Sequence, residues 1–143
     1  AGAGVIRHLW FTWGDQYDPL SLKNLVLRAY WDGHDFPSVE TPLGDFFAMG
    51  HARPQSYSCA VMNCSAWPNA TVTAAFNSWF PMPFAQGARL TVQNQSDKEV
   101  SWFYFYVDLD QLPALPEDQL RFHAWWNREN PCRPAPVKAP TTS

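Results

Sequence analysis

Hydrophobic and polar residues alternate along most of this chain with a period of two, which is the spacing of side chains on one face of a β-strand. The clearest case is segment 100–108, whose two faces are Phe103, Phe105 and Val107 on one side and Trp102, Tyr104, Tyr106 and Asp108 on the other. We expect the Phe face to belong to the core. The Trp and Tyr face is too large to leave in water, so we expect another sheet, domain or subunit to cover it.

Similar short runs predict further strands at residues 5–13, 24–32, 57–64, 71–76, 88–94 and 120–126. Turn-forming pairs such as Asp32-Gly33 separate these runs, and no run has the period of an amphipathic helix. About eight short strands therefore predict an all-β protein, an antiparallel sandwich with the jelly-roll arrangement. Immunoglobulin-like topology is the alternative fold, but the expected Cys-Trp-Cys framework is missing.

Two carboxylates, Glu40 and Asp45, lie within an otherwise apolar stretch at residues 39–51. A carboxylate among Val, Leu and Phe must be paired, hydrogen-bonded, protonated or directed into a cleft. Pro42 and Gly44 interrupt the same stretch. We therefore predict a strand that bends or bulges here, a feature often found beside functional sites.

Length and charge limit the classes of partner. The chain has 143 residues, which suits one domain, and a net charge of −3 without a basic cluster, so nucleic acid is not an expected partner. No apolar run approaches the roughly 20 residues that a membrane-spanning helix needs. We expect residues 1–130 to form a single jelly roll and the proline-rich residues 131–143 to form a linker or tail.

The three cysteines, Cys59, Cys64 and Cys132, match no zinc-binding spacing, so we expect neither a metal nor a cofactor. A disulfide between Cys59 and Cys64 would close a small loop in an oxidising compartment. Two unpaired buried thiols are the alternative.

Three Asn-x-Ser/Thr sequons begin at Asn63, Asn69 and Asn94. They agree with a secreted or otherwise extracytoplasmic glycoprotein. The chain opens with Ala-Gly-Ala-Gly-Val, without an initiator Met or a signal peptide, so we expect its start to be a processed or cut end.

Five segments in order along the chain resemble one known family. They are Val5-Ile-Arg-His-Leu-Trp, Leu27-Arg-Ala-Tyr-Trp-Asp-Gly, Ser38-Val-Glu-Thr-Pro-Leu-Gly-Asp-Phe-Phe, Pro81-Met-Pro-Phe and Arg121-Phe-His-Ala-Trp-Trp-Asn-Arg-Glu-Asn-Pro. Together they resemble the N-terminal part of the domain-of-unknown-function 2961 family, now glycoside hydrolase family 172. The similarity runs over nearly the whole chain.

The resemblance implies a protein of two jelly rolls that assembles as trimers or larger rings. It implies cleavage or rearrangement of furanosides such as fructose or arabinose units, with sites near subunit interfaces. The family's catalytic glutamates belong mainly to the second jelly roll, so this chain alone is expected to lack them. The alternatives to this partial enzyme are a structural, self-assembling jelly roll, as in capsids or extracellular assemblies, and a glycan-binding module without catalysis.

Glu40 and Asp45 are the candidates for catalysis, because glycoside hydrolysis needs two carboxyl groups across the scissile bond, roughly 5 Å apart for retention or 6.5 to 9.5 Å for inversion. Five positions apart on a straight strand they would face opposite ways, and only a kink at Pro42 and Gly44 would bring them together. The alternative roles are acceptance of sugar hydroxyls in a neighbour's cleft and a structural carboxylate that caps loop amides.

Four other residues are candidates for substrate binding. Asp32, at a strand end, is either a sugar contact or a turn residue, and His51 either contacts substrate or hydrogen-bonds to the bend. Trp79 and Phe84 flank a Pro-Met-Pro turn, so they either form a stacking platform for a sugar or pack against the next domain.

Overall fold

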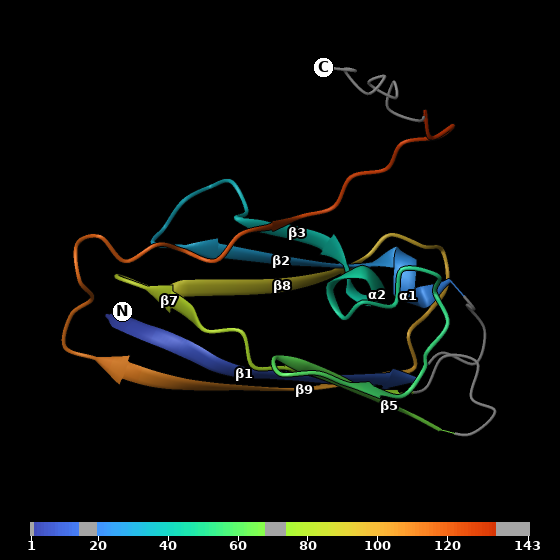
Figure 1. Ribbon diagram of the computed structural model, residues 1–143, viewed down its shortest axis with the longest axis horizontal. Helices are drawn as coiled ribbons and strands as arrows, with labels where there is room; N and C mark the ends of the chain where they lie inside the picture. Colours follow the sequence, from blue (N-terminus) through green and yellow to red (C-terminus); the bar gives the residue numbers. More distant parts are fainter. Residues whose placement is uncertain (1, 15–19, 68–73, 134–143) are drawn as a thin grey trace, which may run out of the picture.

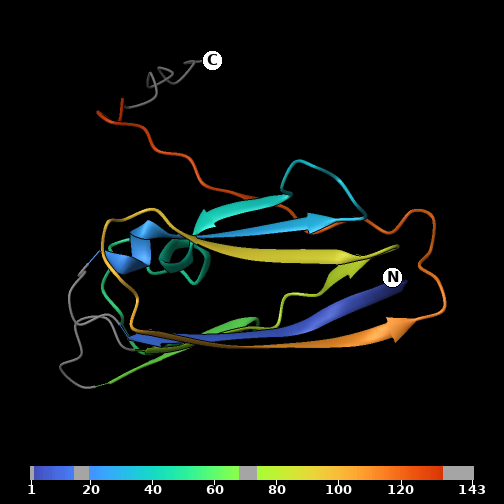
Figure 2. The same cartoon turned by 180° about the vertical axis from the view of Figure 1, so that it is seen from behind.

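The computed structural model describes residues 2–14, 20–67 and 74–133. They form two β-sheets that pack face to face, and two short helices lie together at one end of the sandwich (Figures 1 and 2). The predicted all-β sandwich is therefore confirmed. None of the helices in the described ranges is long and apolar enough to cross a membrane.

The first sheet is built around one long strand, β1. Its strands are β1 (Ala3–Gly14), β4 (Tyr57–Ser58), β5 (Met62–Ala66), β6 (Ala74–Ser78), β7 (Met82–Phe84) and β9 (Trp102–Leu112). On one side of β1, β6 pairs with Leu9–Phe11 and β7 with Gly4–Ile6, all antiparallel. On the other side, β9 pairs with the whole length of β1. This makes β9 an edge strand of the sheet.

The second sheet has the order β10-β3-β2-β8. Its strands are β2 (Leu25–Trp31), β3 (Val39–Pro42), β8 (Ala88–Asn94) and β10 (Ala124–Trp125), of which only β10 runs parallel to its neighbour. Strands β1 and β2 lead from the first sheet to the second, and β8 and β9 lead back. Because β1 pairs with β9 and β2 with β8, the strands that precede and follow these two crossings lie side by side, as a jelly roll requires.

The predicted bend at Pro42 and Gly44 is a change from strand to helix. Strand β3 ends at Pro42, and the helical turn α2 (Leu43–Phe46) follows at once. It packs on α1 (Ser21–Asn24) so closely that a Cβ at Gly44 would lie 2.8 Å from the Leu22 carbonyl oxygen. The expectation of a strand that bends or bulges here was wrong, because residues 43–46 form a helical turn that packs against α1.

Two other strand predictions also need correction, and a third is only partly covered by the described residues. Residues 57–64 form a hairpin of β4 and β5 rather than one strand, since Tyr57 pairs with Cys64. The predicted strand at 120–126 contains only the two residues of β10. Residues 71–73 lie outside the described ranges, and the strand expected from residue 71 is seen from Ala74.

The two faces of β9 alternate as predicted, but each face carries exposed aromatic side chains. Phe103 and Val107 pack against the core, whereas Phe105 remains 60% exposed although it points the same way. The assignment of Phe105 to the core was wrong, because the second sheet does not cover β9 evenly along its length. Tyr104 and Tyr106 also remain exposed, although Trp102 packs beside Tyr104 and Trp10 beside Tyr106.

The domain boundary expected after residue 130 stays a prediction. Most of the proline-rich segment, residues 134–143, lies outside the described ranges.

We predict that Gly44→Ala destabilises the fold by about 1–3 kcal/mol, because the added methyl group would overlap backbone atoms of α1. The measurement is the free energy of unfolding in urea. Gly87→Ala is the matched control, since a Cβ there has no atom within 4 Å and should leave stability nearly unchanged. Equal stability of the two variants would show that the contact between α1 and α2 is loose.

Candidate functional site

A pocket of about 620 Å³ lies on the outer face of the second sheet, beside the two short helices. Its charged, polar and aromatic lining consists of Lys23, Arg28, Glu40, Thr41, Gln95, Trp126 and Arg128. These side chains come from α1, β2, β3, the turn after β8 and the segment after β10. The pocket therefore depends on the assembled sheet.

Glu40 points to the outer face of β3 and pairs with Arg28 on the neighbouring strand. The two residues are in register between β2 and β3, and the Arg28 guanidinium donates to the Glu40 carboxylate through Nε. A second donor on the same guanidinium, Nη1, reaches Oε1 of Gln93 on β8 at 2.7 Å. Three adjacent strands thus hold one polar network across the sheet.

Asp45 is held by three hydrogen bonds at the edge of this pocket. Lys23 Nζ donates to both carboxylate oxygens, at 2.8 and 2.7 Å, and Trp126 Nε1 donates to Oδ1 at 3.2 Å. The backbone amide of Trp126 also donates to the Glu40 carbonyl oxygen at 3.1 Å. Trp126 therefore links the two carboxylate-bearing residues, and the strand-to-helix change at Pro42 brings Asp45 to the same end of the sheet as Glu40.

Two tryptophans give this face an aromatic surface. Trp125 is opposite Glu40 in the parallel pairing of β10 with β3, and both Trp125 and Trp126 are exposed. Exposed indole rings beside ion-paired carboxylates provide stacking and hydrogen-bond acceptors together. This combination suits a ligand with apolar faces and many hydroxyl groups.

Sequence reasoning selected Glu40 and Asp45 but missed Lys23, Arg28 and Trp126. The alternation in residues 25–31 puts Arg28 on the outer face of its strand, so the sequence did contain a signal for Arg28. The partnership of Lys23 with Asp45 had no comparable signal, because it depends on the packing of α1 against α2.

Asp32 holds a turn together, which was the structural alternative for this residue. Asp32 and Gly33 both have positive φ, 56° and 80°, and His34 N donates to the Trp31 carbonyl oxygen at 3.1 Å. Oδ1 accepts from the amides of Ala85 and Gln86, both at 2.7 Å. The backbone of β2 is therefore tied to the end of β7.

The other oxygen of Asp32 forms a mostly buried ion pair with Arg121, whose Nε lies 2.7 Å from Oδ2. Burial acts to raise the pKa of Asp32, but the hydrogen bonds from Gln86, Arg121 and Ala85 outweigh it, and the net pKa is lowered. Both carboxylate oxygens are thus engaged, and the proposed sugar contact would have to compete with three hydrogen bonds.

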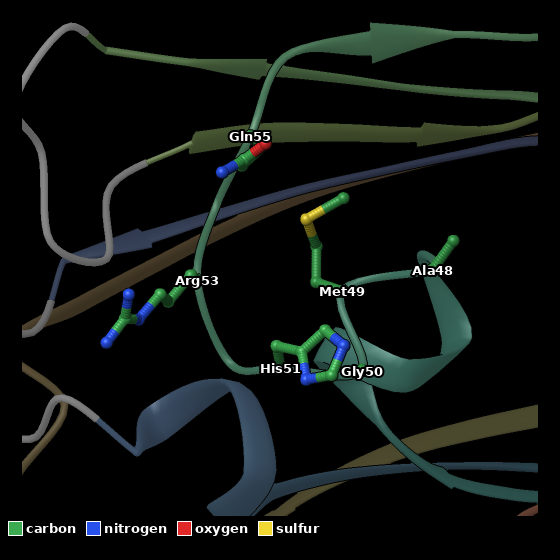
Figure 3. A pocket seen from close by; sticks show the side chains of 6 residues that line it. All are labelled: Ala48, Met49, Gly50, His51, Arg53 and Gln55. Carbon is green, nitrogen blue, oxygen red and sulfur yellow. The ribbon is translucent and has the colours of Figure 1, made fainter.

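His51 lies in a different pocket, of about 540 Å³, on the loop between α2 and β4. Figure 3 shows its lining, in which the Arg53 side chain points away from the His51 ring. Met49, Gly50 and Gln55 complete much of the wall. The structure therefore does not bring His51 together with the pocket beside Trp126, and its predicted contact with substrate stays a prediction.

Trp79 and Phe84 have separate environments. Trp79 is exposed and stacks on His8, with ring centroids 5.2 Å apart and planes 8° apart. Phe84 is buried in β7, where a Cβ on Gly4 would lie 2.7 Å from its ring. The expectation of a shared stacking platform was wrong for Phe84, because pairing of β7 with β1 turns its ring inward.

The predicted glycosylation sites are distributed over both sheets. Asn63, on β5, accepts a hydrogen bond from Asn77 Nδ2 at 2.8 Å. Asn94, at the exposed end of β8, donates to the Lys98 carbonyl oxygen at 2.7 Å. Asn69 lies outside the described residues. Modification of all three stays a prediction.

Cys59, Cys64 and Cys132 are free thiols in the structure. The expectation of a Cys59–Cys64 disulfide is not met, because Cys64 points into the core while Cys59 is exposed in the hairpin. Burial raises the pKa of the Cys64 thiol to about 11. Burial also raises the pKa of the neighbouring Tyr57 to about 12, and its hydroxyl donates to the Phe47 carbonyl oxygen at 2.8 Å.

The fold and the pocket define an all-β jelly-roll domain with exposed tryptophans beside ion-paired carboxylates. A model of the GH172 domain-like family matches residues 1–105, and the chain belongs to this family. It is therefore a glycoside hydrolase-related domain, as the sequence resemblance indicated. No curated protein matches the chain.

We predict that Asp32→Asn lowers the free energy of unfolding by about 1–3 kcal/mol at neutral pH, because Asn keeps the turn but loses the charge opposite Arg121. Since the folded-state pKa of Asp32 is lowered, its contribution is present above the ordinary pKa of 3.8 and disappears as pH falls through the folded value. Urea unfolding of both proteins across this range measures the difference. The exposed Asp35→Asn is the control, and a pH-independent difference would contradict the prediction.

We predict that a thiol reagent at pH 8 titrates Cys59 and Cys132 in the folded protein and reaches Cys64 only after unfolding, because Cys64 is buried and its thiolate is scarce. Absorbance of the released chromophore gives the count. Cys59→Ser should remove one fast equivalent. A single reactive thiol in fully denatured, unreduced protein would instead indicate the disulfide.

Proposed function

We propose that this chain is the N-terminal jelly roll of a furanoside-acting glycoside hydrolase of the fructofuranosidase or arabinofuranosidase type. In this proposal it works in a homo-oligomer, a trimer or a multiple of one, together with a second jelly roll. The observation that carries the proposal is the pocket lined by Glu40 and the exposed Trp126, with Asp45 held beside it by hydrogen bonds from Lys23 and Trp126. Membership of the GH172 domain-like family supports the reaction class.

Within that enzyme, the pocket of this chain recognises sugar rather than cleaving it. A general acid must hold a proton, whereas Glu40 is paired with Arg28 and Asp45 with Lys23. Carboxylates held in ion pairs keep free lone pairs for sugar hydroxyl groups. The catalytic pair is therefore supplied by the second jelly roll, and Glu40 and Asp45 orient the furanose ring.

A glycan-binding module without catalysis is the second candidate. It is favoured by the exposed Trp125, which lies next to Glu40 on an open sheet face. Stacking on such rings is a common means of holding a sugar. In both functions the proposed partner is a carbohydrate, and a protein exported from the cytoplasm is supported by the sequons at Asn63 and Asn94.

We predict that Glu40→Gln and Asp45→Asn each lower kcat/KM on aryl furanosides of arabinose or fructose by about 10- to 100-fold, which is the loss expected for one charged hydrogen bond. The complete gene product is assayed for release of the aryl group, and binding to this chain is measured by calorimetry. Asp97→Asn is the control, because that carboxylate is exposed and lies outside the pocket.

The three outcomes separate the candidates. Turnover that falls in both variants supports sugar recognition by an enzyme part. Sugar binding without turnover by the complete product supports the binding module. Unchanged rates in correctly folded variants would remove Glu40 and Asp45 from the site.

A further inference from the structure

A further pocket, of about 450 Å³, opens at the opposite end of strand β2 from the pocket beside Trp126. We call it the Tyr30 pocket, because it is lined by Tyr30 together with residues 33–35 and 86–89. The pocket beside Trp126 includes Val26, near the start of β2, whereas Tyr30 is near its end. One strand of the second sheet therefore leads from one pocket to the other.

Outward-facing side chains connect the two pockets. The odd-numbered residues of β2 are buried in the core, so the even-numbered ones, Val26, Arg28 and Tyr30, point to the outer face. Their partners in register on β8 share this face, and they are Gln93, Thr91 and Arg89. At the usual rise of a strand, the row from Val26 to Tyr30 spans roughly 13 Å. This row is longer than a single furanose ring can cover.

Arg89 presents hydrogen-bond donors at the Tyr30 end of the row. Its guanidinium carbon lies 3.6 Å from the centre of the Tyr30 ring, and stacking on the ring leaves the planar fork of N–H groups directed outward. No carboxylate in the described part of the chain is within ion-pair distance of Arg89, whereas Arg28 is paired with Glu40. The Arg89 fork is therefore available to oxygen atoms of a ligand.

The loop between β2 and β3 borders the Tyr30 pocket. Figures 1 and 2 show this loop rising from the second sheet on the side away from the first sheet, at the end far from α1 and α2. It contributes His34 and Asp35 to the lining, and the next residue, Phe36, is 83% exposed. Charged hydrogen-bonding groups thus lie near an exposed aromatic ring, as they do beside Trp126.

We propose that the sugar site extends along the outer face of the second sheet and holds an oligosaccharide of several furanose units. One end of the ligand occupies the pocket beside Trp126, the middle passes over Arg28 and Thr91, and the other end is held by Arg89 in the Tyr30 pocket. This inference rests on the proposed function, because it extends the same site. It specifies an oligosaccharide chain as the substrate class.

A second jelly roll packed over this face is the rival occupant. It would remove the Arg89 guanidinium from water without a carboxylate partner from this chain, and burial of an unpaired charge is costly. The exposed aliphatic and aromatic side chains of β9, such as Phe105 and Leu109, lie on the other sheet. A face rich in charged and polar groups is better matched to the hydroxyl groups of a sugar chain.

The test is calorimetry of this chain with an aryl furanoside and with linear arabinofuranose and fructofuranose oligosaccharides of two, four and six units. We expect the dissociation constant to fall at least about tenfold between two and six units of the sugar that binds. Arg89→Ala should abolish this gain but leave binding of the aryl furanoside unchanged, because only the longer ligands reach Arg89.

Two further variants show that the fork of Arg89 is responsible. Arg89→Lys keeps the charge but loses the planar pair of donors, so it should also lose most of the gain with length. Arg7→Ala is the matched control, since Arg7 is an exposed arginine on the other sheet, where it pairs with Asp110. It should bind every ligand as the unaltered chain does. Near-ultraviolet circular dichroism checks that each variant is folded.

The complete gene product tests whether this face is open in the whole protein. Arg89→Ala should lower kcat/KM for six-unit substrates at least about tenfold and leave kcat/KM for the aryl furanoside unchanged. If a second jelly roll covers the face, the variant will change both rates alike or neither, and the inference is then wrong.

The remaining outcomes separate this inference from the proposed function. Equal affinity for two and six units, or a gain with length that survives Arg89→Ala, would overturn the extended site. Binding of the aryl furanoside would still support sugar recognition beside Trp126 in that case. Failure of the chain to bind any of the furanosides would overturn both.

Discussion

Burial of two tryptophans with their indole N–H groups satisfied is the constraint on which the site depends. Trp13 is fully buried between the sheets, stacked on Phe76 at 5.0 Å, and its Nε1 donates to Ser21 Oγ at 3.2 Å. A buried indole without an acceptor would lose a hydrogen bond that water supplies in the unfolded chain. The core therefore fixes α1, and α1 carries the Lys23 that holds Asp45.

The buried indole of Trp31 positions a second part of the pocket, the segment that carries Trp126, in the same way. Its Nε1 donates to the Phe122 carbonyl oxygen at 2.7 Å, so a ring buried in the core anchors the segment that leads into β10. Trp126 follows that anchor and donates to both Asp45 and Glu40. The charged pocket on the surface is thus positioned by hydrogen bonds that begin in the apolar core, and a change in core packing would shift the side chains that line it.

The side of the sandwich along the edge strands β8 and β9 differs from the end at which α1 and α2 lie. The helices α1 and α2 lie together at one end of the sandwich (Figure 1), and Leu22, Leu43 and Phe47 from this end belong to the hydrophobic core. Along β8 and β9, inward-facing side chains remain exposed. One end of the domain is thus closed by α1 and α2, whereas the side along β8 and β9 keeps exposed apolar side chains, and this side is separate from the face that carries Glu40.

The sequence by itself determined the fold class and several local features. Alternation with a period of two reports which side of a strand a residue occupies, so it predicted the all-β sandwich and the opposed faces of β9. The turn at Asp32-Gly33 could also be predicted from the sequence, because both positions have positive φ, which favours these residues. The five segments that resemble the glycoside hydrolase family pointed to the family that the comparison then showed.

Only the tertiary structure decided which strands are neighbours and which lie at an edge. Phe105 and Phe103 have the same parity, yet one is exposed and the other packs on the core, because coverage by the second sheet varies along β9. Phe84 is buried by pairing of its strand with β1, and Asp45 meets Lys23 through contact of two helical turns. Periodicity predicts which face of a strand a side chain occupies, but it does not predict which residues that face contacts. Those contacts depend on long-range strand pairing, which is set by the packing of the whole domain.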